Sequence, residues 1–218
     1  MDLALEAGGD ASGISSIGRR AIKSDSESIA TTPDSISPST LDKSDRPVPD
    51  IEVLRYAPAL EIDGDFAGAE FGILVHRFFE LGVAPTQLRE QLAASACLSG
   101  LPDGLVHTLN ERVTTFEAWL SSQFEPVQVL RELPILALDQ AGSVLSGLID
   151  MVVETKDGCW IIDHKSDQVT DSVEAFAHYS VQLEAYRETL QAAGYVVAGT
   201  AINWIRTGEL VRNPSTPD

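Results

Sequence analysis

The chain has 218 residues, 44% of them apolar, and a formal net charge of −18, which together predict one ordinary folded domain and a tail. No apolar run is long enough for a membrane span, and the first residues lack the basic and then apolar pattern of a signal segment. Two cysteines are too few for a disulfide framework or a four-cysteine metal site, so we expect a cytoplasmic protein without a membrane partner.

The two ends of the chain differ in composition from its middle. The first 50 residues are rich in Ser, Asp, Gly, Thr and Pro and show almost no periodic apolar pattern. Such a segment cannot bury enough surface to offset the conformational entropy that folding removes. We therefore predict a disordered tail or linker over residues 1–50, a folded domain over residues 51–212 and a disordered end over residues 213–218.

The middle of the chain alternates between helical and extended patterns. Apolar spacings of three and four predict helices at residues 70–82, 86–98, 102–122 and 171–193. Apolar runs rich in β-branched residues predict strands at residues 127–138, 144–154, 159–163 and 196–205. Pro134 predicts an edge position or a bulge for the first strand, because proline cannot donate a ladder hydrogen bond. Asp157-Gly158 predicts a tight hairpin between the second and third strands.

Three charged residues lie on this hairpin. Asp150 is on its first strand, and Asp163 and Lys165 end the second, so the turn can bring all three together. Two carboxylates suit Mg²⁺, and the ammonium group could orient a water or neutralise a phosphate. Acids and lysines at strand ends are more often solvent-exposed residues. The apolar run 160–162 directly before Asp163 favours a metal site, because such a run is a poor solvent face.

These motifs also resemble a known family. The segments GLID at 147–150 and IIDHKSD at 161–167 resemble the PD-(D/E)XK nuclease superfamily and, within it, the RecB-like domain that ends the AddA and RecB helicase-nuclease subunits. The resemblance covers most of residues 71–205. It implies an α/β fold with a restriction-endonuclease-like core, in which helices flank a central mixed β-sheet in the order α-β-β-β-α-β, with extra N-terminal helices.

The resemblance also implies roles for particular residues. The implied metal ligands are His76, Asp150, Asp163 and the backbone carbonyl of His164, and the implied catalytic residues are Asp150, Asp163, Lys165, Gln182 and Tyr186. Lys165 would orient the attacking water. Gln182 and Tyr186 lie four apart on one helix, and they would contact the active site or the DNA strand.

Two further acids have open roles. Glu132, followed by Leu133-Pro134, stands where relatives often have an acid, and a surface charge paired with Arg131 or another neighbour is an equal alternative. Glu80 lies four residues after His76 on the same helix face, as a helper of that histidine or as a structural partner.

The function implied by the resemblance is a Mg²⁺-dependent DNA nuclease, with Mn²⁺ as a substitute. It would act as an exonuclease on single strands that leave a helicase during double-strand-break repair and recombination. The iron-sulfur cluster of some relatives cannot form, because the chain has only two cysteines. The chain has no phosphate-binding loop of an ATP motor, so the helicase would be an upstream portion or a separate polypeptide.

The charge of the domain opposes this function. Residues 51–218 contain 24 acids and ten bases, a net charge of −14, whereas nucleic-acid binders usually have a basic surface. We therefore expect weak DNA affinity for the chain alone and delivery of DNA by a basic partner. The acidity favours one alternative, a catalytically idle scaffold in a repair complex. A further alternative is a nuclease for RNA or for phage-defence substrates.

Overall fold

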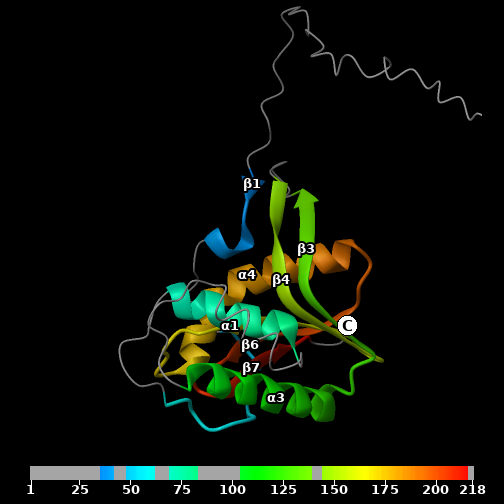
Figure 1. Cartoon of the computed structure of the whole chain (residues 1–218). Coiled ribbons are helices and arrows are strands. Elements are labelled where there is room, and N and C mark those ends of the chain that lie inside the picture. Colours follow the sequence, from blue (N-terminus) through cyan, green and yellow to red (C-terminus); the bar gives the residue numbers. More distant parts are fainter. Residues whose placement is uncertain (1–34, 42–47, 62–68, 83–103, 139–143, 216–218) are drawn as a thin grey trace, which may run out of the picture. The chain divides into compact units, whose positions relative to one another are not determined.

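The computed structural model describes residues 35–41, 48–61, 69–82, 104–138 and 144–215 (Figure 1). All of these belong to one compact unit, Pro33–Asp218. The helix predicted over residues 86–98 lies outside the described ranges. No helix in the described part of the chain combines the length and the apolar character that a membrane crossing requires.

Helices and strands alternate along the chain. The strands are β1 (Ser35–Ile36), β2 (Glu52–Arg55), β3 (Gln128–Leu138), β4 (Val144–Thr155), β5 (Gly158–Lys165), β6 (Val197–Trp204) and β7 (Glu209–Pro214). The α-helices are α1 (Ala69–Leu81), α3 (Leu105–Phe124) and α4 (Ser172–Ala192), and a short 3₁₀ helix, η1, covers Pro38–Thr40. These bounds agree with the three predicted helices and four predicted strands in the described ranges to within a few residues.

The strands form one seven-stranded sheet. Its order is β1-β4-β5-β6-β7-β2. Along β4, the strands β1 and β5 pair with one edge and β3 pairs with the opposite edge. The pairs β3–β4 and β4–β5 are antiparallel, whereas the pair β5–β6 is parallel. The sheet is therefore mixed, and β3 pairs only with β4 among the described strands, as Pro134 predicts.

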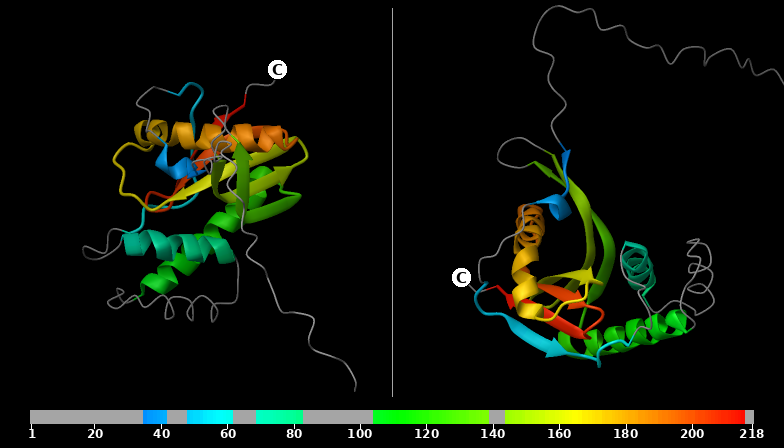
Figure 2. Two further views of the ribbon diagram at one scale, coloured as in Figure 1. Left: turned by 90° about the horizontal axis from the view of Figure 1, so that it is seen from above. Right: turned by 90° about the vertical axis from the view of Figure 1, so that its left-hand side faces the viewer.

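Helices cover both faces of this sheet. Figure 2 shows α1 and α3 on one face and α4 on the other. The first face is closed by a buried aromatic group from α1 and α3 that includes Phe71, Phe78, Phe79 and Phe116, and the second by Phe176, Leu183 and other side chains of α4. The predicted α/β fold with a mixed sheet between helices is confirmed.

Local sequence signals set the ends of the main elements. Asp171 caps α4 by accepting hydrogen bonds from the backbone N of Val173 at 2.9 Å and of Glu174 at 3.0 Å. Gly82 has a left-handed φ of 56° immediately after α1, which a side chain would disfavour. Gly158, the first residue of β5 after the turn, has a φ of 131°.

The sequence-based description of the sheet was wrong at its edges. β3 is not the first strand, because β1 and β2 precede it, and β6 does not close the sheet, because β7 and β2 continue it. β1 and η1 lie in a segment predicted to be without regular structure, and β7 ends at Pro214, past residue 212. β1, β2 and β7 are short and lack a clear apolar alternation, so pairing with distant strands determines them. The domain boundaries themselves stay a prediction.

Candidate active site

The β3–β4 pair has a break at one position. Backbone pairing runs from Gln128 and Glu154 to Leu138 and Val144, but it omits Glu132 opposite Asp150. Glu132 has a left-handed φ of 48°, which is uncommon for a residue with a side chain. Next to this break, Ile149 faces the α4 side and Met151 faces the α1 and α3 side, so the regular alternation stops at Asp150. The break directs both carboxylates toward α1.

Asp150 contacts two elements besides its own strand. Its Oδ2 accepts a hydrogen bond from the backbone N of His164 at 2.7 Å, and its Oδ1 lies 3.5 Å from Nδ1 of His76 on α1. Glu132 completes this group, because single ligand atoms of His76, Glu132 and Asp150 all lie within 4.8 Å of one another. Among the described residues, no other group of acids, histidines and cysteines is close enough to share a metal ion in this way.

The electrostatics of this group keep Asp150 ionised. Burial alone would raise the pKa of Asp150, but the hydrogen bond and charge of His76, with His164, hold the pKa below its usual value. The same contact raises the pKa of His76. Burial and the nearby charges of Asp150 and Glu80 raise the pKa of Glu132. A cation between these groups would relieve the repulsion between the two carboxylates.

Asp163 lies on β5 and is 3% exposed. Its Oδ2 is 2.7 Å from Nζ of Lys165, and its Oδ1 accepts a hydrogen bond from Nε2 of Gln182 at 2.9 Å. The same Gln182 nitrogen donates to the hydroxyl of Tyr186 at 3.0 Å, and that hydroxyl donates to the backbone oxygen of Leu148 at 2.9 Å. Gln182 and Tyr186 therefore connect Asp163 to β4, two residues before Asp150.

Burial dominates the electrostatics around Asp163. It raises the pKa of Asp163 to about 6, although the ammonium group of Lys165 acts in the opposite direction. Burial alone would lower the pKa of Lys165, but Asp163 raises it, so Lys165 is held as a cation. Nζ of Lys165 also lies 4.6 Å from the centre of the Tyr179 ring, and the Tyr179 hydroxyl donates to Asp167 at 2.8 Å.

The imidazole of His164 points away from these groups. It is 2% exposed and packs against Phe79, with ring centres 4.5 Å apart, and against Phe116 at 5.8 Å. Its Nδ1 lies 3.1 Å from Nδ2 of Asn203, and burial lowers its pKa to about 3. The side chain of His164 is therefore a neutral core group, and its backbone is the part that faces the carboxylates.

The structure brings the predicted residues into two adjoining groups. His76 and Asp150 lie on the α1 side, and Asp163, Lys165, Gln182 and Tyr186 lie together on the α4 side. The backbone of His164 and the hydroxyl of Tyr186 join the two groups. Glu132 belongs to the first group, although the sequence left its role open. Glu80 bonds to Arg77 at 2.7 Å rather than to His76.

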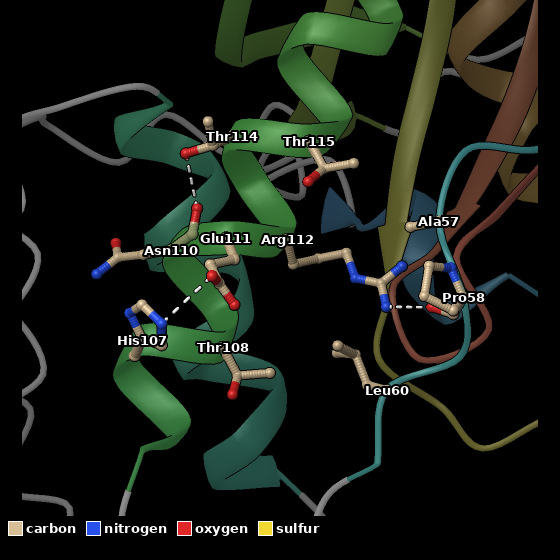
Figure 3. A pocket seen from close by; sticks show the side chains of 10 residues that line it. All are labelled: Ala57, Pro58, Leu60, His107, Thr108, Asn110, Glu111, Arg112, Thr114 and Thr115. Atoms are coloured by element: carbon tan, nitrogen blue, oxygen red, sulfur yellow. Dashed lines mark hydrogen bonds and ion pairs between the residues drawn. The ribbon is translucent and has the colours of Figure 1, made fainter.

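A separate cavity of about 580 Å³ lies between α3 and the segment that follows β2 (Figure 3). Arg112 reaches across it, and its Nη2 donates to the backbone oxygen of Pro58 at 2.6 Å. His107 pairs with Glu111 on the same helix at 3.3 Å, and both are exposed. These contacts tie the loop to α3 and bring together no cluster of acids.

Residues 52–212 match the PD-(D/E)XK nuclease superfamily. The chain belongs to this superfamily. Comparison with curated proteins gives no match. Among solved structures, one titled "Crystal structure of SSO0001" aligns with 72% of this chain and 72% of its own chain, at 12% sequence identity and a TM-score of 0.35.

Superfamily membership implies a metal-dependent nuclease and agrees with a restriction-endonuclease-like fold. The donor set fits a divalent cation, because one imidazole and two carboxylates lie within reach of a single ion and a third carboxylate lies close by. The choice of Mg²⁺ and the narrower RecB-like assignment stay predictions.

Proposed function

We propose that the chain is a Mg²⁺-dependent DNA nuclease of the RecB and AddA type. It acts as a single-strand exonuclease together with a helicase in double-strand-break repair and recombination. The observation that supports this most is that His76, Glu132 and Asp150 can share one cation, while the ion pair of Asp163 and Lys165 lies near enough for the charge of Asp150 to raise the pKa of Asp163. Nothing in the fold requires like charges to gather in a partly buried place, where their repulsion costs stability without a cation.

Each residue of the site has a proposed role. His76, Glu132, Asp150 and Asp163, with the backbone carbonyl of His164, hold one or two Mg²⁺ ions, for which Mn²⁺ can substitute. A bound cation supplies Lewis-acid stabilisation of the negative charge that develops on the phosphate oxygens. Lys165 is held protonated by Asp163, so it donates hydrogen bonds and orients the attacking water or the phosphate rather than accepting a proton.

The helicase partner is proposed from the charge. A domain with a net charge of −14 repels a polyanion, and the cation of the site offsets only part of this repulsion. We therefore expect slow cleavage by the chain alone and faster cleavage when a basic motor protein supplies the strand end.

The test is cleavage of labelled single-stranded and duplex DNA, and of RNA, in Mg²⁺, Mn²⁺ and EDTA, with and without a helicase. Asp150→Asn should reduce cleavage to background, because it replaces the charged carboxylate that would bind the cation with a neutral amide. Asp157→Asn is the matched control, since Asp157 is exposed in the turn of the same hairpin. Equal cleavage by wild type and Asp150→Asn would refute the proposed mechanism, and a preference for RNA would refute the DNA assignment.

A catalytically idle scaffold remains a second candidate for one specific reason. Both oxygens of Asp163 already have contacts within the chain, an ion pair of Oδ2 with Lys165 and a hydrogen bond of Oδ1 with Gln182, so a cation is not needed to balance its charge. Calorimetric titration with Mn²⁺ separates the two. The nuclease should bind Mn²⁺ with an affinity that Asp150→Asn abolishes, whereas an idle scaffold should show no binding that depends on Asp150.

A further inference from the structure

Arg206 follows the end of β6 and bonds to the end of β5. Its Nε donates to the backbone oxygen of Ser166 at 2.7 Å, and the backbone N of Ile205 donates to the oxygen of Lys165 at 3.0 Å. These two adjacent bonds hold the backbone on either side of the link between Lys165 and Ser166. The backbone that carries Lys165 is thereby fixed to β6 beyond the regular ladder.

Arg206 also contacts α1. Its guanidinium carbon lies 4.3 Å from the centre of the Phe71 ring, in the first turn of that helix. Next to Phe71, a Cβ on Gly72 would lie 3.3 Å from Oγ of Ser166, so α1 approaches the end of β5 closely at this point. His76 is about one turn further along the same helix. A shift of the first turn of α1 would therefore move the His76 imidazole relative to Asp150.

From these contacts we infer that Arg206 is a positioning residue, which sets the distance between α1, with His76, and the end of β5, with Lys165. This inference rests on the proposed function and adds a residue to its site. Arg206 acts through Ser166 and Phe71, and it needs no contact with the metal ion or with the DNA. Groups that bond directly to metal ligands change metal affinity or activity by about 10–100-fold when removed, and Arg206, which is one contact further away, should lie at the low end of that range.

Arg212 on β7 is a matched control. Its Nε donates to Glu52 at 2.7 Å, and its guanidinium carbon lies 5.2 Å from the centre of the Trp160 ring. Like Arg206 it donates from Nε and contacts an aromatic ring, although it bonds to a carboxylate, with Nη2 also 2.6 Å from Glu52, and lies 6.0 Å from the centre of a second ring, Phe124. Neither partner of Arg212 belongs to the site.

The experiment measures Mn²⁺ affinity by calorimetry, kcat and KM for single-stranded DNA, and the melting temperature for wild type, Arg206→Gln, Arg206→Lys and Arg212→Gln. Arg206→Gln should weaken Mn²⁺ binding and lower kcat, each by about tenfold, with an unchanged KM. Arg206→Lys keeps the charge near Phe71 but lacks the planar fork, so its losses should be intermediate. Arg212→Gln should leave Mn²⁺ affinity and kcat at wild-type values.

Three results would overturn the inference. A higher KM alone would make Arg206 a DNA contact, equal losses in Arg212→Gln would make the effect general, and wild-type values in Arg206→Gln would remove the role. If Arg206→Gln fails to fold, Phe71→Leu removes only the ring, and it should still weaken Mn²⁺ binding severalfold; no change there would also overturn the inference. A wild type that binds Mn²⁺ but cuts no DNA refutes the proposed nuclease, while the Mn²⁺ affinities still test the position of His76.

Discussion

The two aspartates of the site occupy neighbouring strands, but their surroundings differ. Asp150 faces α1, where its Oδ1 lies 3.5 Å from Nδ1 of His76, and its pKa lies below its usual value. Asp163 faces α4, where a neutral amide and one lysine hold both of its oxygens, and burial raises its pKa to about 6. We propose that the two aspartates have different roles, in which Asp150 binds the cation and Asp163 is first held by donors of the chain.

The largest expected effect comes from removing the ammonium group of Lys165, which lies beside Asp163. Lys165→Met should lower cleavage at least about 100-fold, because a charged donor aimed at the reacting groups is lost. The same change should leave Mn²⁺ binding intact or strengthen it, since one oxygen of Asp163 becomes free for the metal. Cleavage rates and calorimetry measure the two effects.

Lys156→Met in the exposed turn is the control for that variant, and it should behave as wild type. Cleavage by Lys165→Met at the wild-type rate would contradict the role of the ammonium group. Parallel loss of Mn²⁺ binding and cleavage would instead make Lys165 part of the metal site.

A smaller effect is expected from removing the hydrogen bonds by which Gln182 and Tyr186 link Asp163 to β4. Gln182→Leu removes the amide donor to Asp163, and Tyr186→Phe removes the bond to the Leu148 oxygen. We expect Gln182→Leu to lower kcat by about tenfold and Tyr186→Phe by less, because the amide touches the carboxylate directly and the hydroxyl acts through it. Single-turnover cleavage measures both, and the reverse order would contradict a positioning role for the pair.

The smallest effect concerns stability without metal. Because the folded chain binds the Asp163 proton more tightly than the unfolded chain, that protonation stabilises the fold at low pH, and the contribution is lost as pH rises through about 6. Asparagine does not titrate. In EDTA, the melting temperature of the Asp163→Asn variant should therefore rise relative to that of wild type between about pH 4 and about pH 6. A difference that is constant with pH would show that the Asp163 pKa is not raised.

The sequence predicted the central elements because their signals are local. The hairpin turn at Gly158 and the apolar spacing of α1, α3 and α4 arise from neighbouring residues, and the register of the hairpin then brings Asp150 and Asp163 close. The superfamily followed from those same motifs and is confirmed. The RecB-like function and the roles of the site residues stay predictions.

Other parts depend on contacts between distant segments. β1, β2 and β7 are short strands that form only beside their partners, so no pattern within them predicts a strand. Glu132 joins the candidate metal-binding group because the β3–β4 pairing breaks at that residue, and no local signal predicts a left-handed backbone at a glutamate. The Glu132-Leu133-Pro134 motif did indicate an acid at this position, but it left the role of that acid open.

The backbone of Glu132 has a consequence for the evolution and engineering of this fold. At a φ of 48°, the backbone conformation costs glutamate more free energy than it would cost glycine, by an amount on the order of 1 kcal/mol. A selection for more thermostable variants would therefore favour glycine at this position and remove a carboxylate of the proposed site. Glycine at position 132 would favour stability, whereas glutamate there supplies a carboxylate to the proposed metal site. Selection for stability alone would therefore remove a residue that the proposed activity needs.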